Sequence, residues 1–281
     1  MRDVSYFAPE DIGEAVSVLA EHGEKAAILA GGTDLVKALN YYEVKPEVLL
    51  YIGNLGLDYI KEEDGKLIIG AGTTVAHLLD SELVAQKFGV LADAARTHGS
   101  PAVRTTATIG GNLGTASRAG DLIPSLMVMD AELLLKSAGD ERAVRVQDFF
   151  TGPGETVLAP DEIIVEIHVP LLDGACVFEK IGRRKAQICS IASAAVRLVM
   201  DDGVCKDARI VMGSMAPVPL RCTKAEGMIT GKSLDQQAID ACAAQAVAEC
   251  TPIDDQRATA WYRTQVGNAL VARALAQAAG V

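Results

Sequence analysis

Residues 108–121 read TIGGNLGTASRAGD, and the remainder of the chain is best understood as a scaffold around this segment. Its glycines, Gly110, Gly111, Gly114 and Gly120, are interspersed with small hydroxyl and amide residues. Glycine lets backbone N–H groups approach a ligand closely because no Cβ intervenes, and the short polar side chains add neutral hydrogen-bonding groups. This combination is typical of a phosphate-bearing ligand held by backbone amides, while composition alone leaves a plain glycine-rich turn open as the alternative.

A second glycine segment lies near the N-terminus. Residues 29–35 read LAGGTDL; they follow a strand-like run and precede a helical pattern. Neither segment matches a common nucleotide-binding fingerprint. Gly70 and Gly72 resemble the start of a Rossmann motif, but Val75 stands where its third glycine belongs, and no P-loop or nucleophile-elbow sequence is present. Two such turns favour one shared ligand.

Composition narrows the class of protein. The chain has 281 residues, 49% of them hydrophobic, with a net charge of −11. The acidic balance and the lack of basic runs disfavour binding to nucleic acid or anionic membranes. No apolar run is long enough to span a membrane, and the N-terminus has no signal-peptide pattern. A cytoplasmic protein is expected.

Cysteine and histidine usage predicts no metal site. The six cysteines all lie beyond residue 175, none forms a CxxC motif, and the four histidines are scattered. The cysteines are expected to be small buried residues in a reducing compartment.

The hydrophobic pattern predicts an α+β protein of two domains. Residues 1–172 form the first, with subdomains of about 1–55 and 56–172, and residues 173–281 form the second. The predicted helices span 9–22, 31–40, 74–79, 90–97, 122–129, 234–250 and 255–278. The predicted strands span 25–30, 47–52, 66–69, 131–136, 143–146, 162–169, 176–181, 191–200 and 208–215, and the strand 66–69 closes a hairpin that starts at 57 and turns at 63–65. The last three strands form an antiparallel sheet covered by helices.

Three polar groups each allow more than one interpretation. His98, beside a glycine turn, is a wall of the ligand site, a capping residue or a general base. Asp121 is the N-cap of the following helix, a hydrogen-bond acceptor for a ligand hydroxyl, or both. Lys180, with Arg183 and Arg184, is a solvated strand end or a positive edge that stabilises a reduced cofactor or attracts an acidic redox partner.

The sequence resembles the FAD-binding medium subunit of molybdenum hydroxylases of the xanthine, carbon monoxide and nicotinate dehydrogenase type. The resemblance is carried by AGGTDL at 30–35, ATIGGNLGTASRAGDLIP at 107–124, DEIIVEIHVP at 161–170, FEKIGRRKA at 178–186, GSMAPVPLR at 213–221 and WYR at 261–263. It implies the two-subdomain FAD-binding fold of the vanillyl-alcohol-oxidase type, followed by the small C-terminal domain of these flavin subunits.

The resemblance also implies where FAD contacts the chain. The segment 29–36 would wrap the pyrophosphate through backbone amides, and 108–112 would hold it from the other side. His98 would line the adenine-side wall, while Ile164 and Lys180 would lie close to the isoalloxazine ring. The implied contact residues are Leu29, Ala30, Gly31, Gly32, Thr33, Asp34, Leu35, Val36, His98, Thr108, Ile109, Gly110, Gly111, Asn112, Thr115, Asp121, Ile164 and Lys180.

The implied function is electron transfer, with no catalytic side chain. FAD would be non-covalent, because Thr33 stands where some relatives have histidine, and the absence of cysteine before residue 176 excludes an added iron–sulfur cluster. Molybdopterin would reside on a large partner subunit and two [2Fe–2S] clusters on a small one, with NAD(P)+, a quinone, ferredoxin or oxygen as acceptor. The alternatives are a stand-alone flavin oxidase or dehydrogenase and a flavin-free assembly subunit.

Overall fold

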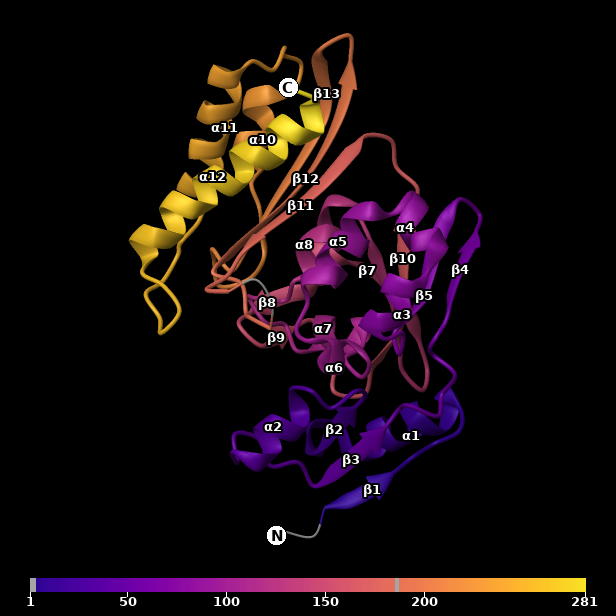
Figure 1. The fold of residues 1–281 in the computed structure, drawn as a ribbon. Helices are drawn as coiled ribbons and strands as arrows, with labels where there is room; N and C mark the ends of the chain where they lie inside the picture. The colour runs from indigo at the N-terminus through magenta and orange to yellow at the C-terminus, as the bar shows by residue number, and fades with distance from the viewer. Residues whose placement is uncertain (1–3, 185–186) are drawn as a thin grey trace.

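A computed structural model describes residues 4–184 and 187–281. The chain runs from an N-terminal unit at the bottom of Figure 1, through a helix-covered sheet, to a second sheet with helices at the top. The N-terminal unit has a parallel sheet in the order β1-β3-β2. Its elements are β1 (Ser5–Phe7), α1 (Ile12–His22), η1 (Gly23–Lys25), β2 (Ala26–Leu29), α2 (Leu35–Asn40) and β3 (Val48–Tyr51).

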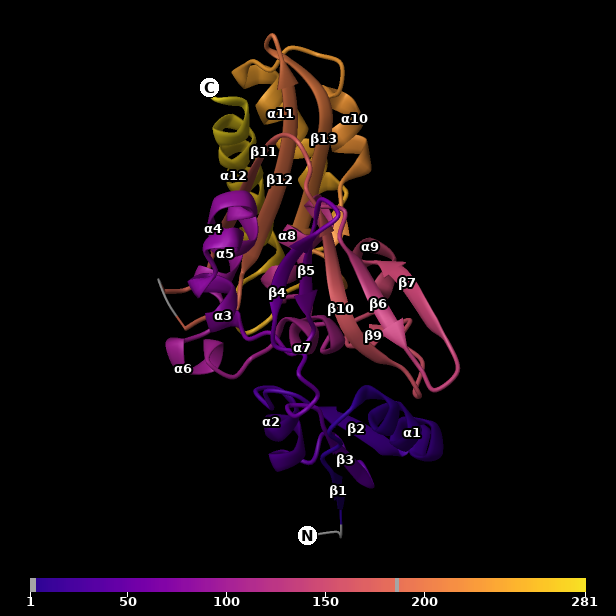
Figure 2. The same ribbon diagram turned by 90° about the vertical axis from the view of Figure 1, so that its right-hand side faces the viewer.

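The middle unit is an antiparallel sheet in the order β4-β5-β10-β6-β7. Its strands are β4 (Ile60–Glu63), β5 (Lys66–Gly70), β6 (Glu132–Lys136), β7 (Glu141–Arg145) and β10 (Ile163–Pro170), with the hairpin β8 (Phe150–Gly152) and β9 (Glu155–Thr156) beside them. Its helices are α3 (Val75–Asp80), α4 (Glu82–Lys87), α5 (Gly89–Thr97), α6 (Pro101–Arg104), α7 (Ile109–Gly114), α8 (Leu122–Val128) and α9 (Val146–Phe149). Figure 2 shows the sheet with α3, α5 and α8 beside it.

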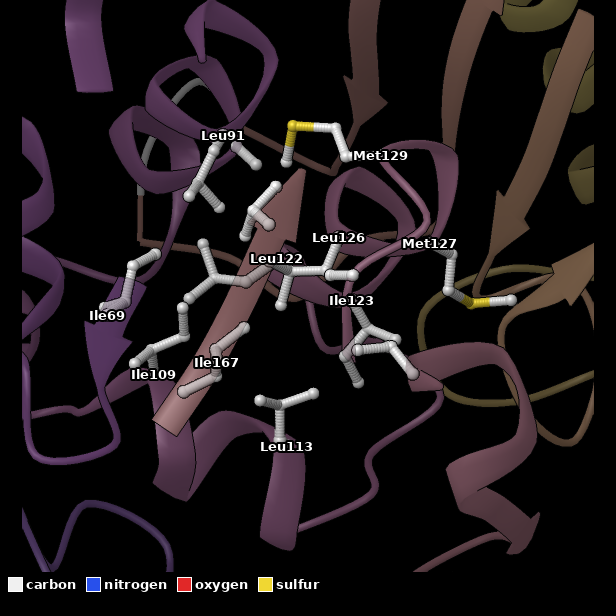
Figure 3. Close-up of a cluster of buried hydrophobic side chains, with 14 of the residues drawn as sticks. Ile69, Leu91, Ile109, Leu113, Leu122, Ile123, Leu126, Met127, Met129 and Ile167 are labelled. Atoms are coloured by element: carbon white, nitrogen blue, oxygen red, sulfur yellow. The ribbon is translucent and has the colours of Figure 1, made fainter. Parts of the chain in front are cut away.

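The core of this unit joins its sheet to its helices. Ile69 of β5 and Ile167 of β10 meet Leu91 of α5, Ile109 of α7 and Leu122 of α8 in one buried cluster, which Figure 3 shows. Since β10 is the central strand and α8 is buried along its length, both are fixed by packing. The cluster holds the second glycine segment in place through its apolar residues.

The C-terminal unit is an antiparallel sheet in the order β11-β12-β13-β14. Its elements are β11 (Ala175–Ile181), β12 (Ala192–Asp201), β13 (Val204–Gly213), β14 (Leu220–Arg221), α10 (Thr223–Ile229), α11 (Gln236–Ala248) and α12 (Ala260–Ala279). One face packs against α10, α11 and α12, and the other against α5 and α8 of the middle unit. Successive strand residues point to opposite faces. Val177 therefore joins the core under α10, α11 and α12, and Phe178 joins the core of the middle unit.

The long elements match the predictions from sequence, and several ends differ. The first helix begins at Ile12 rather than Pro9, because Asp11 caps it by accepting from the amide of Glu14. The last helix begins at Ala260 rather than Asp255, because Thr259 is its cap. The short helices α4, α6, α7, α9 and α10 and the strands β1, β8, β9 and β14 were not predicted. The described helices include none long and apolar enough to cross a membrane.

Candidate functional site

The first glycine segment packs directly against the chain that leads into the second. A Cβ atom on Gly31 would lie 1.7 Å from the carbonyl oxygen of Thr106, a distance that no side chain tolerates. Gly32 has a φ of +71°, in the left-handed region that glycine adopts without strain. The expected meeting of the two segments therefore has a physical cause, which is close backbone contact at Gly31.

The backbone amides of the first segment are available for a ligand. Among the described residues, none accepts a hydrogen bond from the amides of residues 31–35, whereas Val36 N already donates to Gly32 O at 3.0 Å. Successive N–H groups without acceptors form the kind of concave donor surface that binds phosphate oxygens. Leu29 to Thr33 and Leu35 are half-buried, and Asp34 and Val36 are exposed, so the segment borders solvent.

The second segment begins a helix, and four of the five amides of residues 108–112 already have acceptors within the protein. Thr108 is the N-cap of α7, and its Oγ1 accepts from Gly111 N at 3.0 Å while its carbonyl accepts from Asn112 N. Ile109 N donates to Thr73 O and Gly110 N to Ala71 O, both at 2.9 Å. Of the amides of residues 108–112, only that of Thr108 has no acceptor among the described residues, so ligand contact from this segment falls to that amide and to side chains.

Side chains of α7 remain for ligand contact. The Thr108 hydroxyl keeps its own proton free to donate, and the Asn112 Oδ1 atom is buried without a hydrogen-bond partner. Gly110 serves packing instead, because a Cβ there would lie 2.6 Å from Ala71 O. Thr115 is exposed just after the end of α7.

A buried ion pair lies beyond α7. The Nζ atom of Lys180 donates to Asp121 Oδ2 at 2.6 Å and to Thr97 O at 2.9 Å, and both charged side chains are 5% exposed. Ser190 donates a further hydrogen bond to Asp121 Oδ1. Lys180 lies two residues after Phe178 on β11, so both side chains are on the face that packs on the middle unit. This placement brings the Lys180 ammonium to Asp121.

Two sequence interpretations fail at this ion pair. The carboxylate of Asp121 does not cap α8, since it makes no hydrogen bond to the first turn. Lys180 is not a solvated strand end, although Arg183 and Arg184 of the same cluster are exposed. Ser190 was missed, because no local pattern marks a serine that meets a carboxylate far along the chain.

His98 lies on the same carboxylate. Its Nδ1 atom is 3.8 Å from Asp121 Oδ2 and has no hydrogen-bond partner. Burial lowers the pKa of His98, against the opposing attraction of Asp121, so the neutral ring is favoured. Because His98 and Lys180 share one neighbour, they cannot serve opposite ends of an extended dinucleotide, as their assignments to the adenine and the isoalloxazine imply.

The remaining predicted contact residue is part of the hydrophobic core. Ile164 on β10 is 6% exposed and belongs to the cluster around α7 and α8, next to a bulge in the pairing with β6. The bulge leaves Val165 unpaired with β6, and its carbonyl accepts from the amide of Ala71 instead.

The cysteines and the donor set bear on cofactor chemistry. Cys205, Cys222 and Cys242 are buried as expected, and burial raises the pKa of Cys242 to about 12, but Cys189 is exposed, contrary to expectation. Within residues 4–184 and 187–281, no group of three or more acidic, histidine or cysteine side chains could hold a metal.

The free amides of residues 31–35, the unpartnered Asn112 oxygen and the buried Lys180 ammonium fit a phosphate-bearing redox cofactor.

Comparison with known proteins identifies the two parts of the chain. Residues 2–172 match a family described as the FAD binding domain in molybdopterin dehydrogenase. Residues 177–278 match a family described as the CO dehydrogenase flavoprotein C-terminal domain.

Individual relatives cover nearly the whole chain. The glyceraldehyde dehydrogenase medium chain of Sulfolobus acidocaldarius is 31% identical over 99% of both chains. The nicotinate dehydrogenase FAD-subunit of Eubacterium barkeri is 34% identical over 86% of this chain and 84% of its own. A solved carbon monoxide dehydrogenase structure from Hydrogenophaga pseudoflava superposes with a TM-score of 0.95 at 33% identity, covering 99% of this chain and 97% of the other.

These matches confirm the predicted fold, in which an FAD-binding domain precedes a C-terminal flavoprotein domain. They also agree with the donor set described above, which suits a phosphate-bearing cofactor. The chain belongs to the molybdenum hydroxylase family as its FAD-binding subunit, and its class is that of an oxidoreductase.

Proposed function

We propose that this chain binds FAD non-covalently and serves as the electron-transfer subunit of a heteromeric molybdenum hydroxylase. It takes electrons from a [2Fe–2S] subunit and passes them to an external acceptor such as NAD(P)+. A molybdopterin-binding large subunit carries out the hydroxylation. FAD supplies the conversion between one-electron and two-electron transfer.

The observation that carries this proposal is the convergence of two features in one region. The loop 31–35, whose amides have no acceptor among the described residues, packs at Gly31 against Thr106 at the entry to α7, and the ion pair of Asp121 and Lys180 is buried in the same domain interface region. Asp34 of the first segment is close enough to His98 to act on its pKa, which links the amide-lined loop to the charged cluster. A pyrophosphate needs the first feature and a redox-active ring benefits from the second.

Each group then has a role that needs no proton transfer. The amides of residues 31–35 hold phosphate oxygens, and the Thr108 hydroxyl and the Asn112 side chain add polar contacts. Lys180 places a buried positive charge near the ring and favours electron-rich forms of the cofactor. Ser190 and Thr97 hold the ion pair in position.

We also propose that residues 1–172 and 173–281 are the two domains, the first divided near residue 55.

The names of the relatives support the heteromeric assembly. They are called a medium chain and an FAD-subunit, terms that belong to multi-subunit enzymes. The stand-alone oxidase is favoured only by His98, whose buried Nδ1 atom has no partner. Co-purification from the native host decides between them: partner chains that carry molybdopterin and iron–sulfur clusters support the proposal, and a catalytically complete single chain overturns it.

The first experiment is an absorption spectrum of the purified chain before and after acid precipitation. Visible flavin bands that move to the supernatant would support non-covalent FAD. Colour that stays with the pellet would contradict non-covalent binding while leaving FAD binding intact. A colourless chain after reconstitution with FAD would favour the assembly subunit.

A further inference from the structure

A cavity of about 330 Å³ lies beside the Asp121 cluster, between the second glycine segment and the C-terminal unit. Its lining includes Arg118, Ser190, Ser214, Asp255, Arg257 and Arg263. Ser190 is shared with the ion pair, since its hydroxyl donates to Asp121. The volume lies near the lower end of the ~300–1,000 Å³ typical of ligand pockets. The cavity is therefore large enough for a small metabolite.

The lining carries an excess of positive charge. Asp255 is the only carboxylate among the lining residues, and it accepts from Arg257 at 3.1 Å and from Arg263 at 2.8 Å. Arg263 is fully engaged, because it also donates to the carbonyls of Ile253, Ile191 and Ser214.

The other two arginines keep donors for a ligand. In the described part of the chain, the Arg118 guanidinium has no hydrogen-bonding or ion-pair partner. Arg257 donates to Asp255 through its Nη1 atom and lies beside the thiol of Cys189, which also lines the cavity, so part of its guanidinium remains for a ligand. Two planar forks in one cavity, with a single carboxylate already satisfied, form a site for an anion.

Ser214 supplies an independent sign of a ligand. The residue is 2% exposed, and its hydroxyl oxygen is buried without any hydrogen-bond partner. Its φ of +62° is unusual for a residue with a side chain, and the backbone is held there from both sides. Ser214 N donates to Arg118 O at 2.8 Å, and Ser214 O accepts from Arg263 at 3.2 Å. A strained, buried and unsatisfied hydroxyl is costly unless something else binds it.

We propose that this cavity is a second binding site, separate from the flavin site, for a phosphate group of a small molecule. Arg118 and Arg257 bind the phosphate oxygens, and the hydroxyl of Ser214 completes the contacts. Guanidinium forks with a hydroxyl match the tetrahedral oxygens of phosphate, and the remaining volume admits either inorganic phosphate or a small phosphate monoester. Through Ser190 the bound charge is close to the pair of Asp121 and Lys180.

Calorimetric titration of the FAD-loaded full chain tests the site. The probes are inorganic phosphate and ribose 5-phosphate, with chloride at matched ionic strength and unphosphorylated ribose as references. Saturable binding of phosphate but not of chloride is expected. Tighter binding of ribose 5-phosphate than of phosphate would identify a monoester as the preferred source, and equal binding would identify the free ion.

Two variants and a control locate the binding. Arg118→Gln is expected to weaken binding about tenfold or more, the effect of losing a charge-assisted hydrogen bond. Ser214→Ala should weaken phosphate binding severalfold, and this substitution leaves the charge of the cavity unchanged. Arg145→Gln, which changes an exposed arginine on β7, should leave the affinity unchanged. The flavin spectrum of each variant reports that the chain is folded.

Three outcomes would overturn the proposal. One is the absence of saturable phosphate binding in the wild-type chain. Another is equal affinity in Arg118→Gln, Ser214→Ala and Arg145→Gln. The third is binding by the FAD-free chain only, since that result would place the anion where the flavin phosphates bind.

Discussion

At the scale of single residues, the ion pair of Lys180 and Asp121 is the most consequential contact of the site. Lys180→Met is expected to cost about 3–5 kcal/mol of unfolding free energy, because it leaves the Asp121 carboxylate buried without its cation. The side chains are 5% exposed, so solvent cannot replace the lost partner. Urea unfolding of the two chains measures the difference.

The matched control is the double variant Lys180→Met with Asp121→Asn. It should recover a large share of the lost stability, since the uncompensated charge is gone. A single variant as stable as the wild type, or a double variant whose cost is the sum of the two single costs, would contradict this account of the pair.

His98 gives the chain a predicted dependence on pH. Burial lowers the pKa of His98 in the folded state, whereas in the unfolded state it returns to about 6.5. As the pH falls through that value, the unfolded chain takes up a proton that the folded chain resists, so the free energy of unfolding decreases. The His98 contribution is complete above about pH 6.5 and is lost on acidification.

His98→Gln removes this contribution. We expect the difference in unfolding free energy between wild type and variant to shift in favour of the variant as the pH falls from about 8 to 5. Urea unfolding at several pH values measures the shift. A constant difference across this range would show that His98 does not titrate in the expected direction.

At the scale of elements, two glycines of α7 offer a matched comparison. A Cβ at Gly110 would lie 2.6 Å from Ala71 O, whereas a Cβ at Gly114 meets nothing within 4 Å. Gly110→Ala is expected to destabilise the chain by about 1–3 kcal/mol through overpacking against backbone. Gly114→Ala should be neutral or slightly stabilising, because alanine favours a helix. Thermal unfolding separates them, and equal midpoints would contradict the packing role of Gly110.

The same helix shows where prediction from sequence stops. The glycine content of 108–114 indicated a turn that offers its amides, whereas Thr108 caps a helix and the turn after β5 accepts the amide protons of Ile109 and Gly110. Glycine content reports close approach but not which partner approaches. The elements α11, β12 and β13 were predictable because their apolar patterns are long, and α8 because it is almost continuously apolar. β14 and the short helices α4, α6, α7, α9 and α10 carry too few residues for a hydrophobic period to show.

Some of the site could not be predicted for a different reason. His98, Asp121, Lys180 and Ser190 come from separate segments of the chain, and the packing of β11 against α5 and of α8 against β12 and β13 brings them together. The family resemblance named three of the four by position, but it could not show that His98 and Lys180 share one carboxylate. Long-range pairing of this kind depends on the tertiary fold.

At the scale of the whole molecule, Arg197 ties the C-terminal unit to the middle one. It is 5% exposed on β12 and donates to the carbonyls of Val128 and Asp173 at 3.1 and 3.3 Å. Arg197→Met should cost about 1–3 kcal/mol, because buried carbonyls lose their donors. It should also make the unfolding less cooperative, so that calorimetry resolves two transitions. One transition with an unchanged midpoint would contradict this coupling.

The central position of β10 has a consequence for the order in which the protein is made. β5 and β6 are not neighbours in the sheet; each pairs with β10, which follows both in the sequence. While the chain emerges from the ribosome, the inner edges of β5 and β6 therefore stay open until Pro170 has been synthesised. Open strand edges recruit other strands. The nascent chain is thus most exposed to aggregation just before β10 appears, and a ribosome that pauses at this point would prolong the danger.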